Sequence, residues 1–288
     1  MPNANAALPI PAEPAAEPVV AYPGREGAHA AAAAEALYPA GDLVPMPSFA
    51  AVAEAVQRDE ASFGVLPIES SLSGPVAETH DILYASSLSI VDEKVLPIRH
   101  CLVAPASVPL ERLRVIHSHP VALDQCRLLL ARLPEATAVA AATTADAARD
   151  VALRGDPTEA AIASERAAAL YGLVVLDRDV GDRRHAFTRF VSVAPYTRLD
   201  RTDRAFRIAF SFVTDHRPGA LHRAIEPLAR RGLDLVQLVS RPLPDSPWRY
   251  RFDAVLTGHP LDPGVQAALR QLATATRSLH VFGAYPAG

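Results

Sequence analysis

The sequence predicts an α/β protein of two units, which cover residues 19–195 and 205–286. In the first unit, short apolar runs alternate with helix-forming segments, which is typical of a mainly parallel sheet covered by helices. In the second unit the expected order is strand, helix, strand, strand, helix, strand, which is the ferredoxin-like arrangement. Residues 196–204 are polar and show no periodicity, so we expect a linker there.

The first part of the larger unit contains two expected strands and three expected helices. The strands are residues 19–22 and 63–68, and the helices are residues 28–38, 48–58 and 76–84. The first helix is rich in alanine, the best helix former, and Ser48 is a suitable N-cap for the second.

The second part of this unit continues the alternation of strands and helices. The expected strands are residues 88–95, 98–104, 115–117, 136–142, 160–163, 173–176 and 188–193, and the expected helices are residues 121–133, 143–154 and 164–172. Pro120 favours the start of the first of these helices, since the N–H that proline lacks would be unpaired there. Gly155 predicts the end of the second.

The smaller unit has two expected helices among four expected strands. The strands are residues 206–214, 233–240, 248–256 and 278–285, and the helices are residues 218–231 and 262–276. Gly232 predicts the end of the first helix. Pro227 lies inside that helix and is expected to kink or shorten it.

Composition and charge exclude several classes of function. The net charge of −4 provides no basic surface, so nucleic acid and anionic membranes are not expected as partners. No apolar run approaches the ~20 residues needed to span a bilayer. Residues 1–18 are rich in proline and alanine, lack the features of a signal peptide, and are expected to be disordered. These features favour a cytoplasmic protein.

The potential metal ligands show no metal-binding pattern. Cys101 and Cys126 are the only cysteines and are expected to be buried thiols. His117 and His119 flank Ser118, but no second cluster supports a metal site. We therefore expect no metal site.

Residues 64–84 are predicted to form a buried strand, a polar loop and a helix. The loop contains Glu69, Ser70, Ser71 and Ser73, and Gly74-Pro75 ends it. Ligands of open α/β sheets bind beyond the carboxyl ends of strands, where these side chains are expected. The segment is either part of a binding site or a polar turn that caps the next helix.

Six sequence motifs resemble those of one enzyme family, in its order and spacing, over about residues 19–285. GVLPIESSLSGPVAETHDIL and HAFTRFVSV resemble the PIENS and NxTRF signatures of prephenate dehydratases, SHPVALDQC resembles their central motif, and AYPGREGAHAAAA resembles their opening turn. HRPGAL and SRPLPDSPWRY resemble the phenylalanine-sensing motifs of the ACT domain joined to these enzymes.

The resemblance implies a fold and an activity. The fold is a catalytic unit of two α/β lobes similar to periplasmic binding proteins, residues 19–98 with 177–195 and residues 99–176, followed by an ACT domain. The activity is conversion of prephenate to phenylpyruvate in phenylalanine biosynthesis, inhibited by L-phenylalanine. The implied reaction needs neither a metal nor an organic cofactor, so none is expected. The family is usually oligomeric, which implies a homodimer or homotetramer. The effector site implied by the motifs comprises Gly219, Ala220, Leu221, Ser240, Arg241 and Pro242.

The resemblance also assigns candidate site residues. Thr188 is the residue carried over as essential, and we expect its hydroxyl to donate toward the leaving hydroxyl of the substrate. The other catalytic candidates are Glu69 and Ser71, and the substrate-binding candidates are Ser70, Ser118, Gln125, Arg189 and Phe190.

Most of these candidates also have a structural interpretation. Glu69 could be a neutral acid beside the dianionic substrate or an anchor for the loop backbone. Arg189 could bind a carboxylate with two hydrogen bonds or form a structural ion pair. Ser70 and Ser71 could cap the next helix, and Phe190 could belong to the core. Ser118 and Gln125 could share a helix face only if the helix starts near Ser118.

Four positions depart from the family pattern. Ser70 and Ala186 replace asparagines, Ala28 replaces the threonine of the opening Gly-Thr, and Val239 replaces a glutamate. Ser70 keeps a donor and an acceptor whereas Ala186 keeps neither, so substrate preference could differ. The alternatives left open are an arogenate dehydratase, a prephenate decarboxylase that does not aromatise its product, and a non-catalytic two-lobed binding protein with an amino-acid-sensing domain.

Overall fold

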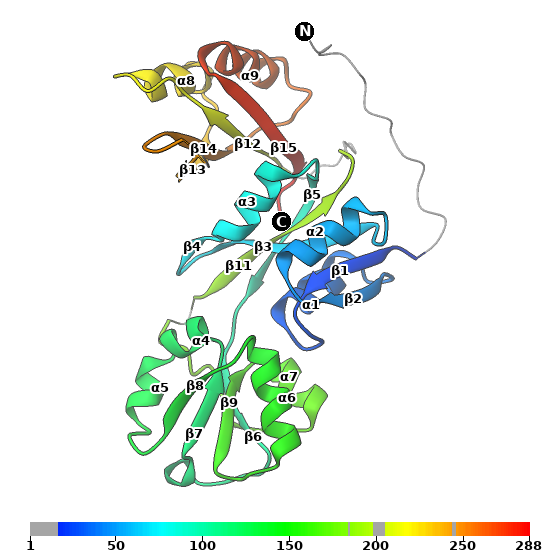
Figure 1. Cartoon of the computed structure of the whole chain (residues 1–288), viewed down its shortest axis with the longest axis vertical. Coiled ribbons are helices and arrows are strands. Elements are labelled where there is room, and N and C mark those ends of the chain that lie inside the picture. The colour runs from blue at the N-terminus through cyan, green and yellow to red at the C-terminus, as the bar shows by residue number, and fades with distance from the viewer. Residues whose placement is uncertain (1–16, 184, 198–204, 244–245) are drawn as a thin grey trace.

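The computed structural model describes residues 17–183, 185–197, 205–243 and 246–288. The described chain forms three bodies along its long axis, with lobe 1 between lobe 2 and the C-terminal domain (Figure 1). The expected tail lies outside the described residues except for residues 17–18, and the expected linker lies outside them except for residues 196–197. No helix in these ranges combines the length and apolar character needed to cross a membrane.

Lobe 1 is a mixed sheet with helices on it. The strands are β1 (Val19–Pro23), β2 (Asp42–Met46), β3 (Phe63–Ser70), β4 (Gly74–Pro75), β5 (Ser89–Pro97) and β11 (Phe187–Ala194), and the helices are α1 (His29–Leu37), α2 (Phe49–Gln57) and α3 (Ala77–Ala85). The strand order is β2-β1-β3-β11-β5, and β4 pairs with β3. Ser48 caps α2 as expected, because its side chain accepts from the N–H of Ala51.

Lobe 2 is a second mixed sheet. Its strands are β6 (Cys101–Ala104), β7 (Val115–Ser118), β8 (Thr137–Ala140), β9 (Glu159–Ala163) and β10 (Val174–Asp177), in the order β10-β6-β9-β7-β8. Its helices are the 3₁₀ turn η1 (Leu110–Arg112), α4 (Pro120–Asp124), α5 (Arg127–Ala131), α6 (Thr144–Arg154) and α7 (Glu165–Tyr171).

The alternation of elements predicted mainly parallel sheets, and this prediction is wrong. In lobe 1, β11 is antiparallel to both β3 and β5, and in lobe 2, β6 is antiparallel to both β9 and β10. The reason is the path of the chain, which leaves lobe 1 after β5, builds lobe 2, and returns to lobe 1 as β11. The two crossing segments are joined, since the N–H of Ile98 donates to the carbonyl of Ala186 at 2.8 Å.

The single helix expected over residues 121–133 is also wrong. Helix α4 ends at Asp124 and α5 begins at Arg127, with Cys126 between them at φ −124° and ψ 33°. The Asp182 carboxylate accepts from the backbone N–H groups of Arg127 and Leu128 at 3.0 and 2.9 Å, so it caps α5. A side chain from a distant crossing segment therefore starts the second helix.

The C-terminal domain has the predicted ferredoxin-like fold. Its elements are β12 (Phe206–Val213), α8 (Ala220–Ala229), β13 (Leu235–Pro242), β14 (Tyr250–Thr257), α9 (Pro263–Ala275) and β15 (Ser278–Pro286). The sheet order is β13-β14-β12-β15, and every pairing is antiparallel. Helix α8 ends two residues after Pro227, so it is shorter than the expected range of 218–231.

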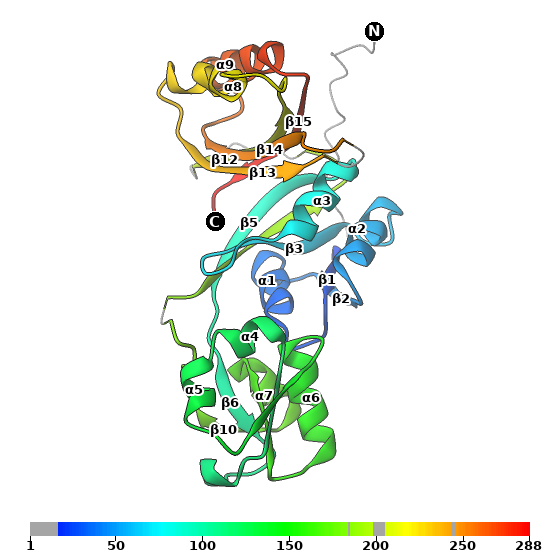
Figure 2. The same ribbon diagram turned by 60° about the vertical axis from the view of Figure 1, so that its left-hand side comes forward.

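The C-terminal domain packs against lobe 1 through its sheet (Figure 2). Phe282 and Val255 belong to one apolar cluster with Leu83 and Ile90 of lobe 1. Strand β15 comes so close to β5 that a Cβ atom on Gly283 would overlap the carbonyl oxygen of Ile90. This packing places β13 beside the end of β3.

Candidate active site

A cleft of about 1440 Å³ lies between the two lobes. Five helices turn their N-terminal ends toward it: α1, α2 and α3 from lobe 1, and α4 and α6 from lobe 2. The lining residues at these ends are His29, Phe49, Val76, Val121 and Thr144. A helix N-terminus carries partial positive charge and free N–H groups, so this cleft suits an anionic ligand.

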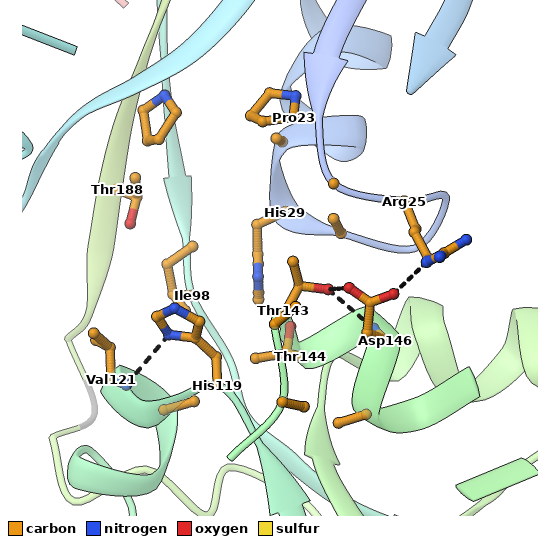
Figure 3. Close-up of a pocket in the computed structure, with 18 of the residues that line it drawn as sticks. Pro23, Arg25, His29, Ile98, His119, Val121, Thr143, Thr144, Asp146 and Thr188 are labelled. Carbon is orange, nitrogen blue, oxygen red and sulfur yellow. Dashed lines mark hydrogen bonds and ion pairs between the residues drawn. The ribbon is translucent and has the colours of Figure 1, made fainter. Parts of the chain in front are cut away.

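The end of β3 and the start of β11 form one wall of the cleft. Thr188 pairs with Ser70 in the strand register, and both residues line the cleft with Phe190. The Thr188 side chain points into the cleft (Figure 3). Among the described residues its hydroxyl has no hydrogen-bond partner, so it is available to a ligand.

Ser70 and Ser71 connect the loop after β3 to its surroundings. The Ser70 hydroxyl oxygen accepts from the N–H groups of Leu72 and Ser73, both at 3.3 Å. The Ser71 hydroxyl oxygen accepts from the N–H of Phe187 at 2.9 Å, next to Thr188 in the chain. Ser71 lines a smaller cavity outside the main cleft, so the structure gives it a positioning contact.

Glu69 and Arg189 do not line the cleft, contrary to the expectation of direct substrate contact. Strand β3 continues to Ser70, so successive side chains alternate between the two faces of the sheet. Ser70 and Thr188 face the cleft, whereas Glu69 and Arg189 face the C-terminal domain. There Nε of Arg189 lies 3.5 Å from the Glu69 carboxylate, which corresponds to the structural ion pair considered from the sequence.

The structure separates Ser118 from Gln125. Ser118 is the last residue of β7 and is fully buried, and its hydroxyl donates to the Ile162 carbonyl at 2.6 Å. Gln125 follows α4 and lines the cleft, with its Oε1 atom 3.0 Å from Nε2 of His100. The condition for a shared helix face is therefore not met, because the helix begins only at Pro120 and ends before Gln125.

Phe190 fits both interpretations considered from the sequence. It is 3% exposed and belongs to an apolar cluster with Tyr22 and Val65. It also contributes to the cleft wall. Its main contact is with the core, and its edge shapes the cleft.

His29 and His100 in the cleft were not selected by the sequence analysis. Their rings lie edge to face with centroids 6.1 Å apart, and His29 lies at the N-terminus of α1. Burial, together with the neighbouring His100, lowers the pKa of His29 to about 4. Burial also lowers the pKa of His100, although the Gln125 hydrogen bond opposes the shift. Both imidazoles are neutral near pH 7, so each has one N–H; that of His100 donates to the Oε1 atom of Gln125, which leaves the N–H of His29 as the imidazole donor for a ligand.

The three arginines that line the cleft are already paired, and the carboxylates of Glu26 and Glu78 also line it. Arg25 forms an ion pair with Asp146 across the cleft, and Arg149 and Arg154 pair with Asp150 and Glu159. The described residues also contain no group of three or more histidines, cysteines and carboxylates that could hold a metal ion. Ligand binding in this cleft therefore depends on hydroxyl, imidazole and backbone N–H donors.

The two lobes touch on the side of α1 and α7. The Tyr171 hydroxyl donates to the Glu26 carbonyl at 2.8 Å, and the Ser164 hydroxyl donates to the Gly27 carbonyl at 3.1 Å. Gly27 has φ +89°, and a Cβ atom there would lie 3.3 Å from Cα of Ala167. The turn before α1 thus needs glycine for its conformation and for lobe contact.

The expected effector residues fall into two separate groups. Gly219, Ala220 and Leu221 line a cavity of about 440 Å³ at the start of α8. Ser240, Arg241 and Pro242 end β13 and do not line that cavity. Arg241 instead donates to the Asp81 carboxylate of α3 at 2.6 Å and to the Ala77 carbonyl at 3.2 Å.

The fold and the cleft define a two-lobed protein, joined to a ferredoxin-like domain, with a cleft that helix N-termini line. Residues 20–197 match the family model described as prephenate dehydratase. The chain belongs to the prephenate dehydratase family, as the sequence motifs predicted, and is a dehydratase, an enzyme of the lyase class.

Curated and solved relatives agree with this family. Arogenate dehydratase/prephenate dehydratase 2 of Arabidopsis thaliana is 37% identical over 276 residues, which cover 93% of this chain and 72% of that protein. The structure of prephenate dehydratase from Arthrobacter aurescens in complex with L-Phe has 31% identity and a TM-score of 0.85, and covers 93% of this chain and 90% of that one. The structure of GqqA, described as a quorum-quenching acylase, has 33% identity and a TM-score of 0.84, and covers 94% and 98%.

Proposed function

We propose that this protein converts prephenate to phenylpyruvate in L-phenylalanine biosynthesis. The observation that carries the proposal is the hydroxyl of Thr188, which has no hydrogen-bond partner among the described residues and points into a cleft lined by helix N-termini. Prephenate is a dianion with a ring hydroxyl. One proton and the dianion give phenylpyruvate, carbon dioxide and water. The bond from the ring to the carboxylate breaks as the bond to the hydroxyl breaks, and the electron pair completes the aromatic ring.

Thr188 donates a hydrogen bond to the departing hydroxyl in this proposal. A neutral donor stabilises the charge that develops on that oxygen. Removing an oxyanion-hole donor costs about 10²–10³-fold in turnover in a well-studied protease, which sets the scale of the expected contribution. Ser71 supports this step indirectly, since it holds Phe187 next to Thr188.

The neutral donors of the cleft bind the two carboxylates of the substrate. The ends of α1 and α6 supply N–H groups, and His29 and Thr144 lie in their first turns. A cationic partner would stabilise the carboxylate that must leave as carbon dioxide, and would so oppose the reaction. Neutral imidazole at His29 holds the carboxylate without that penalty.

Regulation by L-phenylalanine is the second part of the proposal. The Arthrobacter aurescens enzyme was solved with L-Phe, and the C-terminal domain here resembles an ACT domain in sequence. We place the effector at Gly219, Ala220 and Leu221, where a cavity opens at the start of α8. Ser240, Arg241 and Pro242 lie on the edge strand β13, where a second copy of the chain in a homodimer or homotetramer could complete the site.

Arogenate is the alternative substrate, because the Arabidopsis relative carries both activities in its name. Arogenate has an amino group where prephenate has a keto group. Purified protein is incubated with each substrate, and phenylpyruvate and phenylalanine are measured by chromatography. Faster product formation from prephenate supports the proposal, and faster formation from arogenate supports the alternative. Absence of aromatic product from both overturns the proposed activity.

A further inference from the structure

The face of lobe 1 that is turned away from the cleft carries a row of charged side chains. Glu69 of β3, Arg189 of β11 and Glu93 of β5 lie on three neighbouring strands. Glu69 precedes Ser70 in the chain, and Arg189 follows Thr188. Ser70 and Thr188, which line the cleft, are thus each one peptide unit away from a residue that faces the C-terminal domain.

The C-terminal domain contacts both ends of this row. Nε2 of Gln237 on β13 donates to Oε1 of Glu69 at 2.9 Å, and Arg207 on β12 pairs with the buried carboxylate of Glu93. Between them, the Arg189 guanidinium lies 3.5 Å from each of the carboxylates of Glu69 and Glu93. Gln237 therefore holds the first carboxylate of a continuous polar row.

The contacts in this interface are incompletely satisfied. The Nε atoms of Arg189, Arg207 and Arg241 are buried and have no hydrogen-bond partner within the described part of the chain. A buried donor without a partner is costly, so these Nε atoms lower the stability of the docked arrangement.

We propose that Gln237 is a positioning residue for the cleft. Its hydrogen bond fixes Glu69, which fixes Arg189, and the strand register transmits this to the opposed pair Ser70 and Thr188. Docking of the C-terminal domain thereby sets the direction of the Thr188 hydroxyl. This inference rests on the proposed dehydratase activity of the cleft.

The test compares Gln237→Leu with Gln266→Leu. Leucine removes the amide donor of Gln237 at nearly constant size, and Gln266 is a matched control because its amide donates to Pro260 within the C-terminal domain. Displacing a reacting group by about 1 Å can cost ~10²-fold, so we expect Gln237→Leu to lower kcat by roughly 10-fold with little change in KM. The Gln266→Leu variant is expected to keep wild-type kcat. Equal kcat for Gln237→Leu and wild type overturns the inference.

A rescue distinguishes positioning from general damage. Gln237→Glu alone places two carboxylates against each other and should lower kcat further than leucine. Combining it with Glu69→Gln restores one amide and one carboxylate at the contact but removes the carboxylate beside Arg189, so kcat should recover in part relative to Gln237→Glu. A double variant no faster than Gln237→Glu contradicts the proposed contact.

Hydrogen exchange, which needs no substrate, tests the role of Gln237 separately from the proposed dehydratase activity. Hydrogen exchange of the backbone amides of residues 187–190 should be faster in Gln237→Leu than in wild type and unchanged in Gln266→Leu. If wild type consumes neither prephenate nor arogenate, the proposed function fails, and this exchange result alone decides the role of Gln237. Unchanged exchange in Gln237→Leu overturns that role.

Discussion

Replacing Thr188 by valine removes the hydroxyl while conserving the shape of the side chain. Thr188 lines the cleft, and its hydroxyl has no hydrogen-bond partner within the described residues, so its removal leaves no buried group unpaired. Valine also favours a strand, so we expect unfolding free energy to change by less than about 1 kcal/mol. Loss of one donor to a developing oxyanion costs about 2.7–4 kcal/mol, or ~10²–10³-fold in kcat.

The assay measures kcat for prephenate and the thermal unfolding midpoint of the same preparation. Thr188→Ser keeps the hydroxyl and is the matched control, which should retain turnover far above that of the valine variant. A Thr188→Val protein that folds normally and turns over within about 10-fold of wild type would refute the donor role, because such a loss equals only about 1.4 kcal/mol. A Thr188→Val protein with a large loss of stability would show that the hydroxyl has a structural contact.

Three further predictions concern packing, protonation and thiol reactivity. Gly283→Ala should lower the unfolding midpoint, because the added Cβ atom would overlap the Ile90 carbonyl; a midpoint equal to wild type in calorimetry contradicts the close packing. His29 has its folded pKa near 4, below the usual value of 6.5, so the unfolded chain binds more protons and stability falls as pH decreases through that window. Between pH 7 and pH 5 this costs about 2 kcal/mol that His29→Gln should not lose, which denaturant titration of both proteins measures. Cys126 is fully buried with its pKa raised to about 12, so the native protein at pH 8 should resist alkylation there while the denatured protein reacts; equal rates by peptide mass spectrometry would contradict this burial.

Local sequence patterns predicted most helices and strands. The elements that were predicted wrongly depend on a strand's place in the sheet or on a contact from a distant residue. The unpredicted strand β2 has Pro45 in its short sequence, and this proline is tolerated because β2 is an edge strand. The break between α4 and α5 depends on the Asp182 carboxylate, more than fifty positions along the chain. The sequence around residues 121–133 therefore does not show that Asp182 caps a second helix there.

The candidate site shows the same division. Motif resemblance selected Thr188 and Ser70, and the strand register places them opposite each other on the cleft wall. It also selected Glu69 and Arg189, because a contiguous motif does not show which side chains share a face. Extending the strand by two residues and applying its two-residue period would have separated them. His29 had no such signal, since its environment comes from the opposite lobe and from His100.

The positions where this chain departs from its family help to explain that environment. Ser70 uses its oxygen to accept from loop N–H groups, and Ala186 contributes only a methyl group to the cleft wall. Two positions that carry an amide in the family motifs thus offer the substrate fewer donors here. Side-chain hydroxyls, the helix N-termini and the neutral imidazole of His29 are the donors available to an anion in a cleft whose arginines are already paired. A neutral imidazole is compatible with loss of a carboxylate as carbon dioxide. The lowered pKa of His29 and the replacement of the family asparagines by Ser70 and Ala186 are therefore both consistent with a decarboxylating reaction.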